Sequence, residues 1–202
     1  GSKQFGTHEQ FKNEFVTEIA ATLAFSATQN NDKIGLVLFS SDVELFIPPK
    51  KGRPHVLRII RELLEFKPKK KQTDISEALR FLSSVLKKKA IVFLLSDFMA
   101  TDYKQNLKII AGKHDVTGIR VYDRSEVEIS KLGLVQMVDQ ETGRSILVNT
   151  NLKRVRQSYA NLQSEQVNYF KDSFKKAGAG CLDCRTDESY VKKLLGYFKQ
   201  RG

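Results

Sequence analysis

Continuous apolar runs and spaced apolar stripes alternate along this chain of 202 residues. An unbroken apolar run is typical of a strand buried on both faces, whereas apolar residues every three or four positions are typical of a helix with one buried face. The runs predict strands at 34–39 and 90–95, and two further strands are expected at 116–122 and 181–185. The stripes predict helices that begin near Thr7, Arg53, Thr73, Tyr103, Asn151 and Ser189. Strands that alternate with helices indicate an α/β fold with a mostly parallel sheet and helices on both faces.

Two further segments have the pattern of β-hairpins. Val43–Ile47 predicts a short edge strand that returns after residues 34–39 and stops at Pro48. Residues 134–138 and 145–148 flank a loop that contains Gly143, which predicts a hairpin inserted at about 132–149. No segment reads as a linker, so we expect residues 1–202 to form a single domain.

The formal net charge of +11 raises the question of an acidic partner. Many of the basic residues lie in lysine clusters at 67–71, 87–89 and 171–176. These clusters lack the interleaved aromatic residues that single-strand binders use for stacking, so we expect solvated surface and no nucleic acid. No apolar run is long enough to cross a bilayer and no signal peptide opens the chain, which favours the cytoplasm. The Cys181-x-x-Cys184 pair lies in a predicted strand, where we expect reduced structural cysteines.

Asp97 is the first candidate for chemistry, because it follows directly after the buried run 90–95 and Ser96. In open parallel sheets, the carboxyl ends of the strands form the edge at which ligands bind. Thr73 precedes a predicted helix at the same edge, so a hydroxyl and a carboxylate are expected there together. Both are hard oxygen donors of the kind that Mg²⁺ prefers. A simpler reading of the pair is two helix-capping residues.

Three segments together resemble a von Willebrand factor A-type domain: the helix and strand of 11–39, Thr73-Asp-Ile-x-x-Ala-Leu, and Phe93-Leu-Leu-Ser-Asp-Phe. More closely, the chain resembles the bacterial family known as domain of unknown function 58. Members of that family resemble the A-domain partners of MoxR-type AAA+ ATPases. The resemblance covers nearly the whole chain and implies a Rossmann-like sheet.

The resemblance also implies a metal-ion-dependent adhesion site, formed by Asp-x-Ser-x-Ser after the first strand, then a threonine, then an aspartate. Thr73 and Asp97 match the last two positions. Ser2 matches the end of the first motif if Gly1-Ser2 is native rather than a cloning remnant. The aspartate and first serine of that motif are not in the sequence, and neither is the first, central strand, so we expect the domain to be N-terminally truncated. We expect the two flanking strands to collapse together, or another segment or chain to fill the slot.

The resemblance implies a non-enzymatic protein-interaction module, an adaptor or co-chaperone of a MoxR-type AAA+ ATPase. Its cofactor would be Mg²⁺ or another divalent cation, weakly held because two ligands are missing. Two alternatives stay open, a metal-dependent hydrolase and a basic nucleic-acid-binding protein. The hydrolase is disfavoured because only Asp102 follows Asp97 closely and the three histidines are scattered.

Overall fold

The computed structural model describes residues 2–70, 72–127, 129–138 and 145–201, and it confirms an α/β fold. A parallel sheet has the strand order β3–β4–β7, formed by Ile91–Ser96, Asp115–Tyr122 and Gly180–Arg185. An antiparallel pair joins β1, Ile34–Phe39, to β2, Val43–Lys50. The predicted hairpin is also present, as β5, Leu134–Val138, and β6, Ser145–Asn149.

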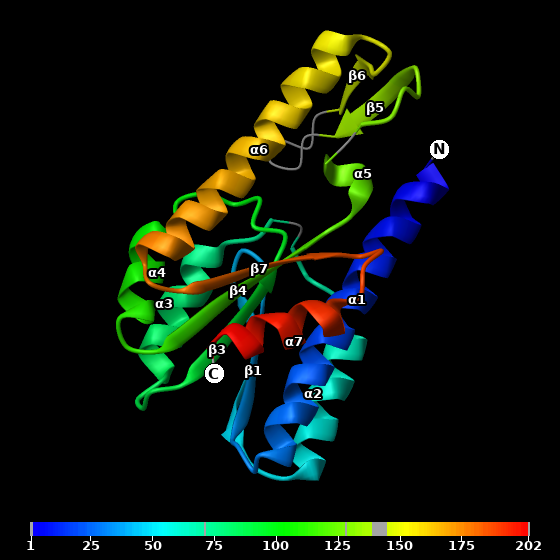
Figure 1. The fold of residues 1–202 in the computed structure, drawn as a ribbon. Coiled ribbons are helices and arrows are strands. Elements are labelled where there is room, and N and C mark those ends of the chain that lie inside the picture. The colour runs from blue at the N-terminus through cyan, green and yellow to red at the C-terminus, as the bar shows by residue number, and fades with distance from the viewer. Residues whose placement is uncertain (1, 71, 128, 139–144, 202) are drawn as a thin grey trace.

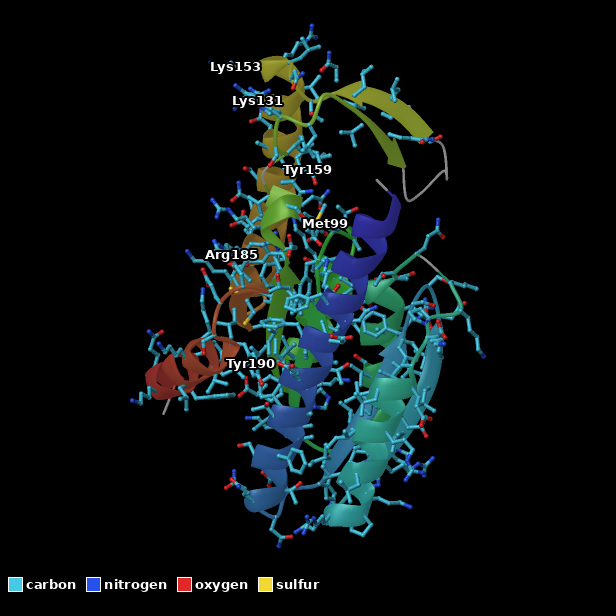
Figure 2. All side chains as sticks on the ribbon, turned by 90° about the vertical axis from the view of Figure 1, so that its right-hand side faces the viewer. Met99, Lys131, Lys153, Tyr159, Arg185 and Tyr190 are labelled. Carbon is cyan, nitrogen blue, oxygen red and sulfur yellow. The ribbon has the colours of Figure 1, made fainter. Side chains whose placement is uncertain are left out.

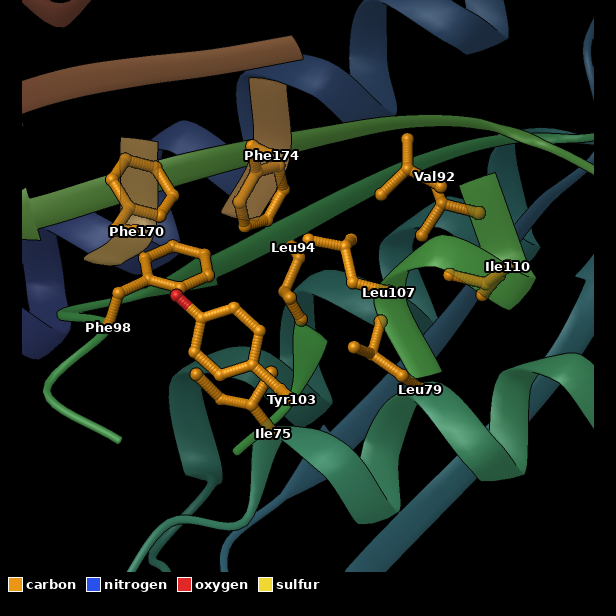
Figure 3. Packing of buried hydrophobic residues seen from close by; sticks show 11 residues of the cluster. Ile75, Leu79, Val92, Leu94, Phe98, Tyr103, Leu107, Ile110, Phe170 and Phe174 are labelled. Carbon is orange, nitrogen blue, oxygen red and sulfur yellow. The ribbon is translucent and has the colours of Figure 1, made fainter. Parts of the chain in front are cut away.

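Helices cover both faces of the parallel sheet (Figure 1). The helices are α1 Ser2–Gln29, α2 Arg53–Glu65, α3 Ile75–Val85, α4 Lys104–Ala111, α5 Arg124–Val127, α6 Lys153–Lys176 and α7 Tyr190–Arg201. One core cluster joins strands β3 and β4 to α3, α4 and α6, and Figure 3 shows its packing around Leu94 and Phe98. A second cluster joins the other face of the sheet to α1 and α7 through Phe15, Ile19 and Leu194. The two clusters explain why β3 reads as a continuous apolar run.

Gly118 allows the long helix α6 to lie directly on strand β4. A Cβ atom at this position would stand 2.5 Å from Cζ of Phe174 and 2.9 Å from Cε2 of Phe170. Both rings are fully buried, so neither can move aside without opening the core. This close approach holds the carboxyl-terminal half of α6, which contains Phe170 and Phe174, against the parallel sheet.

Strands β1 and β3 are the two strands that we expected to flank a central-strand slot. Strand β1 pairs only with β2, and β3 pairs only with β4, within the described part of the chain. Helix α1 contacts both β1 and β4, and α3 contacts β2 while its side chains enter the core with those of β3. The same helices therefore flank both sheets, yet the expected collapse of β1 onto β3 is wrong. A strand supplied from another chain stays a prediction.

Two local expectations were also wrong, and one helix was not anticipated. Helix α1 begins at Ser2 rather than after a cap at Thr7, because residues 3–6 contain no proline and extending an existing helix is cheap. Strand β2 continues through Pro48 and Pro49 to Lys50. Proline is tolerated there because β2 has a single neighbour and its register with β1 is irregular at Ile34 and Leu36. The short helix α5 was not anticipated.

His114 connects the amino-terminal ends of β3 and β4. Its side chain is buried, and Nδ1 accepts a hydrogen bond of 3.3 Å from the backbone N–H of Ala90. Burial, helped by the charge of Lys113, lowers the pKa of His114 below its ordinary value of 6.5. The folded state therefore binds this proton less readily than the unfolded state.

The contribution of neutral His114 to the free energy of unfolding should be complete above pH 6.5. It should be lost as the pH drops through the lowered pKa of the folded state. Protonation of Nδ1 would also remove the acceptor for Ala90. Denaturant unfolding at several pH values checks this, with His114→Gln as the variant. An unchanged acid dependence in the variant would contradict the assignment.

Candidate functional site

Asp97 lies at the carboxyl end of β3, on the edge predicted from the sequence. Its Oδ1 accepts hydrogen bonds from the backbone N–H of Met99 at 3.2 Å and from Ser96 Oγ at 3.5 Å. Ser96 Oγ in turn accepts from the N–H of Phe98 at 3.2 Å. The side chain of Asp97 is 37% exposed. The turn thus holds Oδ1, while Oδ2 faces helix α1 at the partly exposed surface.

Phe98 anchors this turn in the core. It adopts a left-handed backbone conformation with φ of 55°, which is uncommon for a bulky side chain. Its ring is 1% exposed and lies 4.3 Å from the centroid of Phe170 and 5.4 Å from that of Phe174 (Figure 3). Burial of the ring offsets the backbone strain, because the aromatic cluster stabilises this one conformation. The position of Asp97 is therefore set by its neighbour.

Lys12 of helix α1 places its ammonium group on Asp97. Its Nζ lies 3.3 Å from Asp97 Oδ2 and 2.9 Å from Glu126 Oε1, and its side chain is 17% exposed. Burial acts to lower the pKa of Lys12, but the charges of Asp97 and Glu126 outweigh it and raise the pKa above its ordinary value. One ammonium thus pairs with two carboxylates, one after β3 and one in the short helix α5, and the three groups keep a net negative charge.

Thr73 lies at the same edge but does not meet Asp97. It is exposed, and no hydrogen bond joins it to Asp97 among the described residues. Its neighbour Asp74 caps α3 instead, accepting from the N–H of Glu77 at 2.9 Å, and donates its own N–H to the carbonyl of Ser40 after β1. The start of α3 is joined to the loop after β3 by Ser76 Oγ, which donates to the carbonyl of Asp102 at 3.4 Å.

Ser2, the third predicted metal ligand, is the first residue of α1, and its side chain lies outside the described residues. The described residues as arranged do not fit a divalent cation. Lys12 already gives Asp97 a positive partner, and no group of three or more His, Cys, Asp or Glu side chains able to hold a metal occurs in the described part of the chain.

Lys12 and Glu126 were missed as site residues by the sequence reasoning. A signal for Lys12 was present, because it precedes Phe15 by three positions and Ile19 by seven, which places it on the buried face of the helix. A lysine on an apolar face needs a partner of opposite charge. Nothing in the local pattern marked Glu126, since α5 is only four residues long.

A family model described as protein of unknown function DUF58 matches residues 1–169. The chain belongs to this family. The uncharacterized protein Rv1480 of Mycobacterium tuberculosis is 23% identical over 205 residues, which cover 99% of this chain and 64% of the relative. This chain thus spans less than two thirds of the length of that curated relative.

Two solved structures share the fold. The conserved hypothetical protein BatB of Bacteroides thetaiotaomicron has a TM-score of 0.52 at 16% identity, and covers 89% of this chain and 83% of its own. An aerotolerance-related membrane protein of Bacteroides fragilis has a TM-score of 0.51 at 16% identity, covering 89% of this chain and 85% of its own. At such identities the similarity supports the fold alone. In the described part of this chain, no helix has the length and apolar character needed to span a bilayer.

The Cys181 and Cys184 side chains are both free thiols on β7. Burial raises the pKa of both, to about 11 for Cys184. A redox-active thiol needs the opposite shift, toward the thiolate. The geometry therefore favours the structural interpretation of this pair.

Proposed function

We propose that this domain is a non-enzymatic protein-interaction module of the cytoplasm, whose binding face is the edge around Asp97. Its proposed partner is a MoxR-type AAA+ ATPase, for which the domain acts as an adaptor or co-chaperone. The partner class comes from the family resemblance.

The fixed presentation of Asp97 is the observation that carries the proposal. Its turn is tied to the core through Phe98, and its charge is half compensated by Lys12 while the side chain stays 37% exposed. A preorganised carboxylate can accept a charge-assisted hydrogen bond from an arginine or lysine of a partner without first being ordered. The exposed start of α3, with Thr73 and Asp74, extends the same edge.

Direct binding to a purified MoxR-type ATPase tests the proposal, by calorimetry with the whole chain. We expect Asp97→Asn to weaken binding by about ten-fold or more, the scale found when one member of an interfacial charge pair is removed. Asp172→Asn on the exposed surface of α6 is the matched control and should bind like the wild type.

Circular dichroism of both variants verifies that they are folded. Equal binding by Asp97→Asn and the wild type would contradict the proposed face, and absence of binding by the wild type would contradict the proposed partner. The same titration with Mg²⁺ and with a chelator tests the divalent cation, which stays a prediction from the resemblance.

A further inference from the structure

The β5–β6 hairpin and the start of α6 form an arm that extends from the domain at one end of the molecule (Figures 1 and 2). We define the arm as the described residues within 131–156. Its base is well built: Thr150 Oγ1 accepts from the N–H of Leu132 and donates to the carbonyl of Gly133, both at 2.9 Å. The Arg156 guanidinium donates to the carbonyls of Thr150 and Asn151 at 2.7 and 2.9 Å. The arm is therefore a defined structural element.

Large apolar side chains are exposed along the arm. They are Leu132 at 70%, Leu134 at 65%, Ile146 at 59%, Leu147 at 68% and Leu152 at 54%. So many exposed leucine and isoleucine side chains on one small element indicate a surface that binds another protein or a membrane.

The exposed apolar groups lie on both faces of the hairpin. Leu147 pairs with Gln136 and Ile146 pairs with Met137, and consecutive residues of a strand point to opposite faces. Leu134 and Gln136 are two residues apart on β5 and so point to the same face. Leu147 pairs with Gln136, so Leu147 lies on that face too. A protein partner that covers one face would leave the other face in water, whereas the interfacial region of a bilayer surrounds both.

The charge of the arm is basic. The described residues of the arm include four basic ones, Lys131, Lys153, Arg154 and Arg156, and no Asp or Glu, whereas Asp139, Glu141 and Arg144 fall outside the described residues. Lys131 and Lys153 lie near one another at the top of Figure 2, beside the base of the hairpin, and both are exposed. Like charges disfavour contact with the arm of a second copy, while anionic headgroups complement them.

We propose that the arm is a membrane-surface anchor that inserts its apolar side chains among the headgroups of a bilayer containing anionic lipids. Lys131, Lys153 and Arg154 would contact the lipid phosphates. Insertion stays shallow, because within the described residues each of the two strands pairs only with the other, and the polar groups of their outer edges need water or headgroups. The proposal rests on the residues of the arm and does not need the partner proposed above.

Vesicle co-sedimentation of the whole chain tests the anchor, with phosphatidylcholine alone and with phosphatidylcholine mixed with phosphatidylglycerol. We expect binding to the anionic vesicles only. Leu134→Ser with Leu147→Ser should lower the partition coefficient about ten-fold or more, since apolar insertion is lost. Lys131→Glu with Lys153→Glu should do the same and should weaken the salt dependence.

Matched controls come from elsewhere on the surface. Leu64→Ser removes an equally exposed leucine, 70% accessible on α2, and Lys87→Glu with Lys88→Glu removes two lysines before β3. Both controls should bind vesicles like the wild type. Failure of the wild type to sediment with anionic vesicles would overturn the proposal. So would arm variants that sediment like the wild type, or light scattering that shows a dimer abolished by Leu134→Ser with Leu147→Ser.

Discussion

Replacing Phe98 with alanine should lower the free energy of unfolding by about 3–5 kcal/mol, the usual cost of deleting a buried phenylalanine. The ring is 1% exposed and contacts Phe170, Phe174 and Tyr103, so its removal leaves a cavity at the centre of the larger core cluster. The turn that presents Asp97 would lose its anchor at the same time. Guanidinium unfolding followed by circular dichroism measures the loss.

Two variants separate packing from backbone strain at this position. Because φ at residue 98 is 55°, glycine is favoured over alanine there by about 1 kcal/mol, so Phe98→Gly should be no less stable than Phe98→Ala. Phe25→Ala removes an exposed ring, 46% accessible, and should cost less than about 1 kcal/mol. A loss below about 1 kcal/mol in Phe98→Ala would show that the aromatic cluster does not hold the turn.

Replacing Lys12 with methionine should cost about 1–3 kcal/mol, because it leaves Asp97 and Glu126 as neighbouring carboxylates without their shared cation. Methionine is also a long unbranched side chain, so the change mainly removes the positive charge. Adding Glu126→Gln should recover part of the loss, so the double-mutant cycle should give a coupling energy of about 0.5 kcal/mol or more. Lys108→Met, at an exposed position of α4, is the control.

The same contact has a pH signature. The folded-state pKa of Lys12 is raised above its ordinary value of 10.5. Its contribution is therefore complete below pH 10.5 and is lost as the pH rises through the folded pKa. The free energy of unfolding, measured with denaturant below and above that pH, should fall at the higher pH in the wild type but not in Lys12→Met. Zero coupling between Lys12 and Glu126, together with identical alkaline profiles, would mean that the contact contributes nothing.

The candidate site was only partly predictable from the sequence. Asp97 was found because a strand that ends in a carboxylate is a local pattern, and α/β topology carries that residue to the edge of the sheet. The sequence correctly placed Thr73 at the same edge of the sheet as Asp97. Its side chain is exposed, however, and Asp74 forms the amino-terminal cap of α3. Lys12 was not assigned, because its carboxylate partner on β3 lies 85 residues away in the sequence. Only the packing of α1 across the sheet brings the two together.

The sequence by itself determined the order of helices and strands, the parallel sheet and the hairpin. These follow from apolar periodicity and turn residues, which act over a few neighbouring positions. The tertiary structure decided three further features: the pairing of Lys12 with Asp97 and Glu126, the separation of β1 from β3, and the exposure of apolar side chains on both faces of the arm. Each depends on contacts between segments distant in the chain, and local periodicity carries no information on such contacts.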